Sequence, residues 1–334
     1  MQRDLLRRRE VITLLGGAAA ARSLWPLGAR AQTPPPAIGY LAQGTPEGTA
    51  GFLAAVRKGL GEGGLIEGRD FTGEFRYAHH DADRLPGLAV DLIQRRVAII
   101  VALDTFAAAR AAKAATTEIP ILFTVGADPV KAGLVSSLNR PGGNITGIST
   151  MNTAIAPKWI GLLRELLPDA KRCAILVNVA NADAAKALII TAQEAAFALG
   201  LQTEIRFAGN ENEIDLAFAG LGARAQALII QPEVLFVQNL AKLATLAIRE
   251  RLPAIYASRE FALAGGLMAY GSSIIEAHRQ AGVYAARILK GEKPQNLPVQ
   301  QATRFEFLIN LKTAKTIGLT IPSTMLATAN EVIE

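Results

Sequence analysis

Segments typical of strands alternate with segments of helical periodicity along most of this 334-residue chain. Strands are predicted from short runs rich in β-forming residues, at 37–42, 72–77, 98–102, 120–125, 144–149, 172–178, 202–207, 227–231, 254–256 and 267–270. Helices are predicted in the gaps, at 47–61, 82–95, 105–115, 130–138, 157–167, 182–199, 211–221 and 233–249. This alternation predicts an α/β fold in which parallel sheets carry helices on both faces.

The two halves of the chain resemble each other in their order of elements. AIIV at 98–101 and ALII at 227–230 each lead to a polar loop, a helix and a strand introduced by proline. Near the C-terminus, a polar stretch at 292–303 separates a predicted helix at 272–290 from a predicted strand at 304–310. We therefore expect two lobes of like topology, with a ligand cleft where the carboxyl ends of their strands face each other and a hinge that lets it close.

The stretch 119–150 is expected to form one wall of this cleft and part of the hinge. Its first strand ends at Gly126, and Asp128 and Pro129 are suited to the start of the helix that we predict next. The strand at 144–149 follows and offers a passage from one lobe to the other.

Residues 1–31 have the composition of an export signal. Three arginines, Arg7 to Arg9, precede an apolar run at 11–21 that is too short to span a bilayer. The residues up to Ala31 supply a small-x-small cleavage site, so we expect export to the periplasm with cleavage near Ala31. The letters RREVI also resemble a twin-arginine motif, and the twin-arginine and Sec routes both stay open.

Charge and cysteine content narrow the class further. The whole chain has a formal net charge of +6, of which residues 1–31 carry +4, so the remaining 303 residues carry only +2. No basic stripe is visible in them, and a nucleic-acid partner is not expected. The single cysteine, Cys173, excludes an internal disulfide and reads as a buried strand residue. Half of the chain is apolar, which is enough for two domains with cores of their own.

Five motifs spread over the chain carry a family resemblance. They are GADPV at 126–130, LNRPGGNITG at 138–147, GGLMAYG at 265–271, ILKGEKP at 288–294 and FEFLINLKTAK at 305–315. With them the chain resembles the ABC-transporter substrate-binding proteins that include tryptophan-binding lipoproteins, relatives of the type I periplasmic binding proteins. The residue directly after Ala31 is Gln32 and not a cysteine, so a free periplasmic protein is implied in place of a lipid-anchored one.

The resemblance implies two Rossmann-like lobes with parallel sheets, joined by a three-segment hinge. We place lobe 1 at 37–148 plus 272–302, and lobe 2 at 149–271 plus 303–334. The family resemblance further implies that the protein captures a small solute, such as an amino acid or another small carboxylate, and delivers it to an ABC permease in the cytoplasmic membrane. We expect a monomer without cofactor or metal.

Candidate ligand residues follow from the rule that ligands sit at the carboxyl ends of the strands. They are Gln43, Gly44, Thr45, Asp104, Thr105, Thr124 and Asp128 in lobe 1, and Asn178, Asn181, Gln231, Pro232, Tyr256, Arg259, Glu260 and Tyr270 in lobe 2. Hydroxyls and backbone N–H groups at helix starts suit a carboxylate. Acidic side chains suit an ammonium group, and tyrosine faces suit a ring or a cation.

Each choice has a structural alternative. Asp104 and Asp128 are also suited to helix capping, and the threonines to solvated turns. Arg259 and Glu260 can pair with each other, the two asparagines can close a turn, and the tyrosines can serve in packing.

Other functions have weaker support in the sequence. GLGEGG at 59–64 matches a dinucleotide-binding pattern, but it ends a predicted helix where that site requires a preceding strand. His79 and His80, near Asp81 and Asp83, are interpreted as a solvated turn because adjacent side chains diverge. A periplasmic sensor of the same fold remains an alternative, and an α/β enzyme is a weaker one, since P-loop and G-x-S-x-G motifs are lacking.

Overall fold

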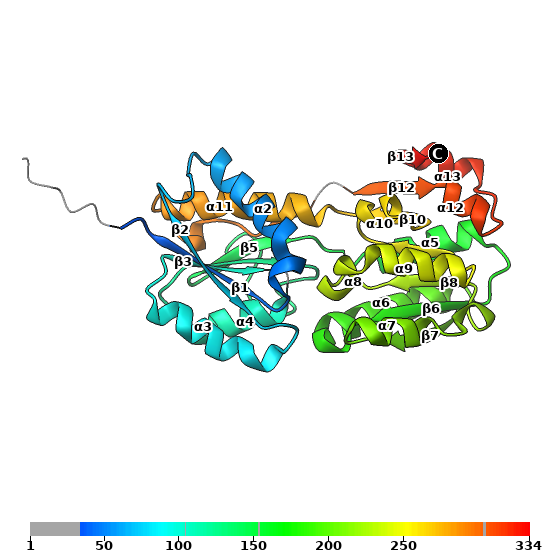
Figure 1. The fold of residues 1–334 in the computed structure, drawn as a ribbon, viewed down its shortest axis with the longest axis horizontal. Helices are drawn as coiled ribbons and strands as arrows, with labels where there is room; N and C mark the ends of the chain where they lie inside the picture. The colour runs from blue at the N-terminus through cyan, green and yellow to red at the C-terminus, as the bar shows by residue number, and fades with distance from the viewer. Residues whose placement is uncertain (1–33, 104, 153, 303–304) are drawn as a thin grey trace, which may run out of the picture. The chain divides into compact units, whose positions relative to one another are not determined.

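Two sheets organise the chain in the computed structural model, which describes residues 34–334 except 104, 153 and 303–304 (Figure 1). The expected signal at 1–31 and the candidate Asp104 therefore lie outside the described residues. The first sheet runs in the order β11 (Gln300–Gln301), β5 (Ile145–Ser149), β4 (Ile121–Val125), β3 (Ile99–Leu103), β1 (Ala37–Ala42), β2 (Thr72–Tyr77). All of its strand pairs are parallel.

The second sheet has seven strands. Their order is β13 (Glu331–Ile333), β12 (Glu306–Asn310), β10 (Met268–Gly271), β9 (Ala254–Tyr256), β8 (Ala227–Ile230), β6 (Arg172–Val177), β7 (Gln202–Phe207). Its pairs are parallel apart from β10 with β12, which is antiparallel. The prediction of an α/β fold with two mostly parallel sheets is confirmed.

Helices connect the strands of each sheet. Those that follow strands of the first sheet are α2 (Pro46–Glu62), α3 (Leu85–Gln94, after the short 3₁₀ turn Ala82–Arg84) and α4 (Phe106–Ala115). Helix α11 (Ile274–Leu289) follows β10 but packs against α2 and strands of the first sheet. Those of the second sheet are α5 (Ala156–Leu166), α6 (Ala182–Ala198), α7 (Glu211–Phe218), α8 (Val234–Gln238), α9 (Leu240–Arg249), α10 (Arg259–Leu263), α12 (Leu311–Thr316) and α13 (Ser323–Thr328).

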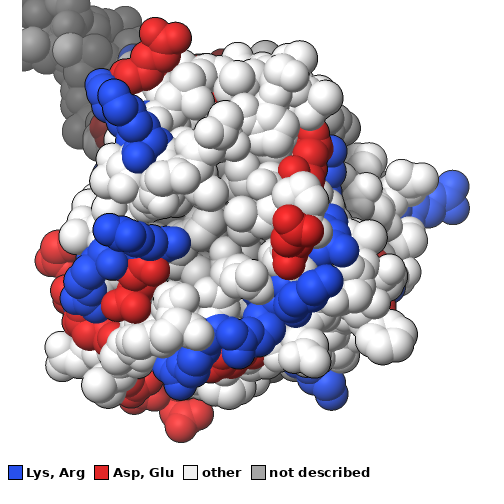
Figure 2. All heavy atoms as spheres, turned by 90° about the vertical axis from the view of Figure 1, so that its right-hand side faces the viewer, with Lys and Arg blue, Asp and Glu red and all other residues white. Residues whose placement is uncertain are grey.

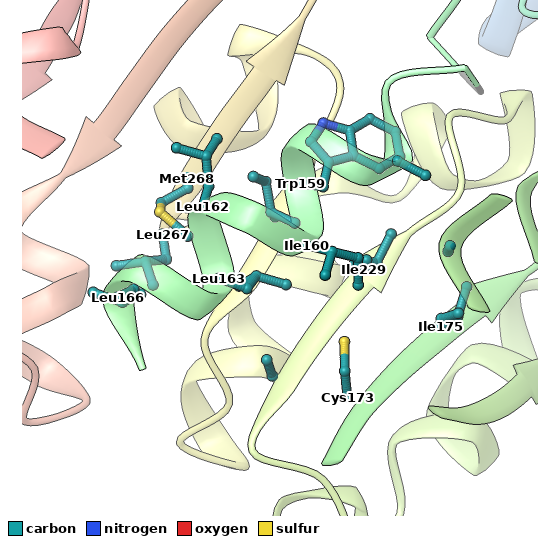
Figure 3. Packing of buried hydrophobic residues seen from close by; sticks show 14 of the residues in the cluster. Trp159, Ile160, Leu162, Leu163, Leu166, Cys173, Ile175, Ile229, Leu267 and Met268 are labelled. Atoms are coloured by element: carbon teal, nitrogen blue, oxygen red, sulfur yellow. The ribbon is translucent and has the colours of Figure 1, made fainter. Parts of the chain in front are cut away.

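Each sheet buries apolar side chains on both faces, because successive strand residues point to opposite sides. In β1, Tyr40 belongs to the cluster under α2 and α11, whereas its neighbour Leu41 belongs to the cluster under α3 and α4. In the second sheet, Trp159 and Ile160 of α5 pack over Ile229 of β8 (Figure 3). The Trp159 indole N–H donates a 2.6 Å hydrogen bond to the backbone oxygen of Tyr270.

Cys173 lies inside this last cluster and is fully buried. Burial raises the pKa of its thiol to about 12. The side chain therefore stays neutral at physiological pH and serves as a small apolar group, as the sequence predicted.

Helices α2 and α11 approach each other closely because glycines face each other between them. A Cβ at Gly59 would lie 1.9 Å from the backbone oxygen of Arg279, and a Cβ at Gly282 would lie 2.1 Å from that of Val56. The predicted helix end at 59–64 is confirmed, since α2 stops at Glu62. This pairing holds α2 with its first turn at the carboxyl edge of the first sheet.

Two helix predictions are wrong. Residues 130–138 form turns in place of a helix, because Gly133 has a φ of +72° and Ser136 bonds to the backbone oxygens of Arg140 and Pro141. The single helix predicted at 233–249 is two helices separated at Asn239, whose side chain donates to the Leu235 oxygen at 2.8 Å. The short elements β11, α10, α13 and β13 were not predicted.

Charged side chains of both signs are interspersed on the face seen in Figure 2, around a large uncharged area. None of the helices among the described residues has the length and apolar character needed to cross a membrane.

Candidate functional site

The carboxyl ends of the central strands in the first sheet lie level with one another. Register pairs Ala42 of β1 with Leu103 of β3, and Ala102 of β3 with Phe123 of β4. Gln43 and Thr124 therefore emerge at the same edge, and they are only 4% and 1% exposed. Polar side chains buried at a strand edge are typical of a ligand site.

The second sheet carries a connected polar cluster at its own carboxyl edge. Gln231, after β8, accepts a 2.7 Å hydrogen bond at Oε1 from the backbone N–H of Asn178, after β6. Asn181 Nδ2 donates a 2.8 Å bond to Glu233 Oε2. The Tyr256 hydroxyl lies 3.4 Å from the backbone nitrogen of Glu233. The carboxyl ends of three neighbouring strands thus meet around Glu233, whose carboxylate is contacted by Asn181 and whose backbone nitrogen is contacted by Tyr256.

The two edges touch in this structure. Gln43 Nε2 donates a 3.4 Å hydrogen bond to the backbone oxygen of Ala180, between Asn178 and Asn181. Gly44 lies against α8, where an added Cβ would be 3.1 Å from Val234 Cγ1. Predicted residues from both halves of the chain are therefore brought together, as a cleft between two lobes requires.

Several buried polar atoms at these edges have no hydrogen-bond partner among the described residues: Gln43 Oε1, Thr124 Oγ1, Gln231 Nε2 and Ser258 Oγ. An unpaired buried polar atom costs about 1–3 kcal/mol, so such atoms call for an explanation. The set comprises an acceptor, a donor and two hydroxyls. A small molecule with both acidic and basic groups would satisfy all of them.

Glu233 supplies the negative charge of the site. Its side chain is 6% exposed, and burial raises the pKa of the carboxyl to about 7, against the hydrogen bond from Asn181 that favours the anion. A cation bound next to it would favour the ionised form. The geometry is therefore suited to an ammonium group.

Four predicted residues use their side chains to cap backbone N–H groups. Thr45 Oγ1 accepts from the N–H three residues on at 3.3 Å, at the start of α2, and Thr105 does the same at 3.2 Å for α4. Asp128 Oδ1 accepts two backbone bonds, at 2.9 and 3.3 Å, in the turn after β4. Asn178 Oδ1 accepts one at 2.9 Å. The turn considered for Asn178 is therefore present, whereas Thr45 and Thr105 cap helices in place of forming solvated turns, and Asp128 bonds within a turn in place of capping a helix.

Tyr256 and Tyr270 both pack against other aromatic rings. Tyr256 is fully buried, with its ring 5.7 Å from that of Phe261. Tyr270 stacks on Phe305, and Lys158 Nζ lies 5.7 Å from the Tyr270 ring centre. The hydroxyl of Tyr256 reaches the Glu233 loop, whereas the Tyr270 ring has its contacts away from that loop.

Arg259 does not pair with Glu260, its neighbour in sequence. Its guanidinium contacts Glu331 at 2.8 Å and Glu306 at 3.5 Å. Glu260 is half-exposed in the first turn of α10, and Pro232 is half-buried beside Gln231. Arg259 therefore belongs to an ion-pair group next to the predicted hinge.

Sequence reasoning missed Glu233 and Ser258. Both sit one or two residues beyond a predicted position, in the loops after β8 and β9. The signal for Glu233 was an acidic residue directly after Gln231 and Pro232 at a strand end. We assigned it to the start of a helix, which is correct for its backbone, since α8 begins at Val234, but this said nothing about where the carboxylate points.

A cavity of about 800 Å³ lies to one side of this cluster. Among the predicted residues, only Arg259 lines it. Its walls come from the end of β5, the start of α11, β11 and the start of β12. Across the described ranges, no group of three or more histidine, cysteine, aspartate and glutamate side chains is arranged to hold a metal ion.

Comparison with known proteins places these features in context. The family model described as "ABC transporter substrate binding protein" matches residues 48–333. A tyrosine-binding protein of Clostridioides difficile (strain R20291) is 26% identical over 262 residues, which are 78% of this chain and 75% of the relative.

Two solved structures are similar over nearly the whole described chain. A conserved domain protein from Vibrio cholerae has a TM-score of 0.81 at 24% identity, covering 89% of this chain and 99% of its own. An ABC domain from Streptococcus pneumoniae in complex with L-Trp has a TM-score of 0.77 at 24% identity, covering 89% and 100%. These likenesses establish the fold.

Proposed function

The chain belongs to the ABC transporter substrate binding protein family, and from this premise we propose that it captures an L-amino acid between its two sheets. The observation that carries the proposal is the buried Glu233 carboxylate, held by Asn181 beside the unpaired Gln231 amide N–H. The Glu233 carboxylate and Gln43 Oε1 would accept hydrogen bonds from the ammonium group of the amino acid. The Gln231 amide and the hydroxyls of Thr124 and Ser258 would donate to the carboxylate.

The side chain of the solute is proposed to be aromatic. A similar protein is named for binding tyrosine, and a similar structure holds L-Trp. Tyr256 borders the cluster through its hydroxyl, while its ring packs in the core of the second sheet. Asp104 is proposed as a further contact, because it directly follows β3, which lies between β1 and β4 in the first sheet.

The proposed lobes are 37–148 with 272–302, and 149–271 with 303–334. The solute would bridge both edges, so that binding favours the closed arrangement by contacts that exist only there. The protein would be exported to the periplasm as a monomer, with cleavage near Ala31, and would deliver its solute to an ABC permease for import.

Calorimetric titration of the purified protein with the twenty L-amino acids tests this proposal. At least one aromatic amino acid should bind, and its N-acetyl derivative should not, because acetylation removes the ammonium charge. Glu233→Gln should weaken binding roughly ten- to a hundredfold, since a hydrogen bond to a charged group is worth about 1.5–3 kcal/mol. Glu194→Gln, an exposed carboxylate on α6, is the matched control. Equal binding of the N-acetyl derivative would refute the role of Glu233.

A further inference from the structure

Two of the places where the chain passes from one sheet to the other are fastened together. The chain leaves the first sheet after β5 and reaches α5, which packs on the second sheet. It returns after β10 to α11, which packs against strands of the first sheet. Asn152 lies on the first of these crossings and Ser272 lies on the second, 120 residues further along the chain.

Asn152 and Ser272 form a network of hydrogen bonds in the interior. The Ser272 backbone N–H donates to Asn152 Oδ1 at 2.9 Å, and Asn152 Nδ2 donates to the Ser272 backbone oxygen at 3.2 Å. The Ser272 hydroxyl lies 3.0 Å from Asn152 Oδ1 and 2.9 Å from the backbone oxygen of Thr150. Asn152 is 0% and Ser272 is 2% exposed. A buried network whose members are all paired is rigid, so the two crossings are held as one unit.

The first crossing continues into the segment that carries Thr124. The Thr150 backbone N–H donates to the Val125 oxygen at 2.9 Å, and the Ser149 hydroxyl donates to the Ala127 oxygen at 2.9 Å. Val125 directly follows Thr124, whose buried hydroxyl has no hydrogen-bond partner among the described residues. The position of that hydroxyl therefore depends on the first crossing.

The second crossing presses on the segment that carries Ser258. A Cβ at Gly271, the residue before Ser272, would lie 2.1 Å from the backbone oxygen of Ala257. This is a contact between two backbones and leaves no room for them to slide. Ser258 follows Ala257, and its buried hydroxyl also has no partner within the described ranges. The network at Asn152 and Ser272 thus links two unpaired hydroxyls, one from each sheet.

We propose that Asn152 and Ser272 are positioning residues for the carboxylate end of the solute. They would hold the Thr124 and Ser258 hydroxyls at the spacing at which both donate to one carboxylate, without touching the solute themselves. The inference rests on the proposed amino-acid site and extends it, since Glu233 serves the ammonium end. Loss of the network would let the two hydroxyls drift apart and would weaken binding.

Calorimetric titration with L-tryptophan, L-tyrosine and L-phenylalanine tests the inference. Asn152→Ala and Ser272→Ala should each weaken binding of the amino acid that the wild type binds by about tenfold. In a Thr124→Val background, which keeps the shape but lacks the hydroxyl, the same substitutions should cost no more than about threefold, because that donor is no longer there to be misplaced. A merely structural role would give the same loss in both backgrounds.

The matched controls are Asn212→Ala on α7 and Ser323→Ala on α13, both at exposed positions, and they should bind as the wild type does. Circular dichroism establishes that each variant is folded. Ser272→Ala keeps the backbone bonds to Asn152 and decides the matter should Asn152→Ala fail to fold. Unchanged affinity in folded Ser272→Ala, or an undiminished loss in the Thr124→Val background, would overturn the inference and leave the proposed function standing. Absence of binding of all three amino acids to the wild type would refute the aromatic amino-acid site and this inference with it.

Discussion

Asn181 Nδ2 donates a 2.8 Å hydrogen bond to Glu233 Oε2, and neither residue is more than 9% exposed. Hydrogen bonds from the Asn178 side chain and from the Val234 backbone also favour the ionised form of this carboxylate, but none of these donors carries a charge. An amide cannot neutralise a charge, so the carboxyl keeps a raised pKa of about 7 through burial. A site held in this way is poised to gain from a cationic group.

Glu233→Gln should stabilise the unliganded protein at alkaline pH. The folded pKa lies above the ordinary value of 4.5, so the folded state binds more protons between these values. The contribution of protonated Glu233 to the free energy of unfolding is therefore fully present below pH 4.5, and it is lost as the pH rises through 7. The loss is on the order of 3 kcal/mol. Urea unfolding at pH 5 and pH 8 should show that the variant has a larger free energy of unfolding than the wild type at pH 8 only. A gain of equal size at both values would contradict the assignment.

Asn181→Ala should destabilise the protein, and more so at pH 8 than at pH 5. The lost bond leaves the ionised Glu233 without this donor, at a cost of about 1–3 kcal/mol. The same urea titrations measure the effect. In a Glu233→Gln background the difference between the two pH values should vanish, because no charge remains to be stabilised. Its persistence there would show that Asn181 acts through another contact.

Strand positions were predictable where alternation and turn residues bracket a segment. The strands at 72–77, 202–207 and 254–256 were placed at their observed bounds because polar or proline-containing turns close them on each side. The two-residue strand β11 has too little pattern to be found, and it exists because its backbone pairs with β5. The helix predicted at 130–138 failed because a single left-handed residue, Gly133, overrides the apolar spacing.

The site was predictable as a location but not in its chemistry. The strand-end rule placed Gln43, Asn181 and Gln231 in one connected region. It could not tell which acidic side chain would be buried: Asp128 is used in a turn, whereas Glu233 points into the cluster. That distinction depends on packing between distant segments, which one-dimensional periodicity does not contain.

His278 should make the protein sensitive to acid. Its ring stacks on Phe52 at 4.4 Å between α11 and α2, and its Nδ1 bonds to the Ile274 oxygen at 2.8 Å. Burial lowers the pKa of the imidazole to about 4, from 6.5. The folded state thus binds fewer protons than the unfolded state. The contribution of the neutral His278 to the free energy of unfolding is therefore fully present above pH 6.5 and is lost as the pH falls towards 4. This loss is on the order of 3 kcal/mol.

His278→Phe keeps the stacked ring and removes the titrating group. Urea unfolding between pH 4 and pH 7 should therefore show a flatter profile for this variant than for the wild type. His79→Asn, which removes an exposed imidazole, should follow the wild-type profile. If His278→Phe retained the full acid sensitivity, the buried imidazole would not be its source.

Gly48→Leu should weaken solute binding by preventing the two edges from meeting. A Cβ at Gly48 would lie 1.5 Å from Gln238 Nε2 of α8, so a leucine there has to displace the Gln238 side chain and occupy the space between α2 and α8. Overpacking of this kind costs about 1–3 kcal/mol, which corresponds to roughly tenfold or more in affinity for the bound amino acid. Gly51→Leu, also on α2, is the matched control, because the atom nearest to an added Cβ there would be Ile275 Cδ1 of α11, 3.9 Å away. Adding Gln238→Ala to Gly48→Leu should restore most of the affinity measured by calorimetry, since it removes the side chain that is struck. If the double variant bound as weakly as Gly48→Leu alone, the contact between α2 and α8 would not be what limits closure.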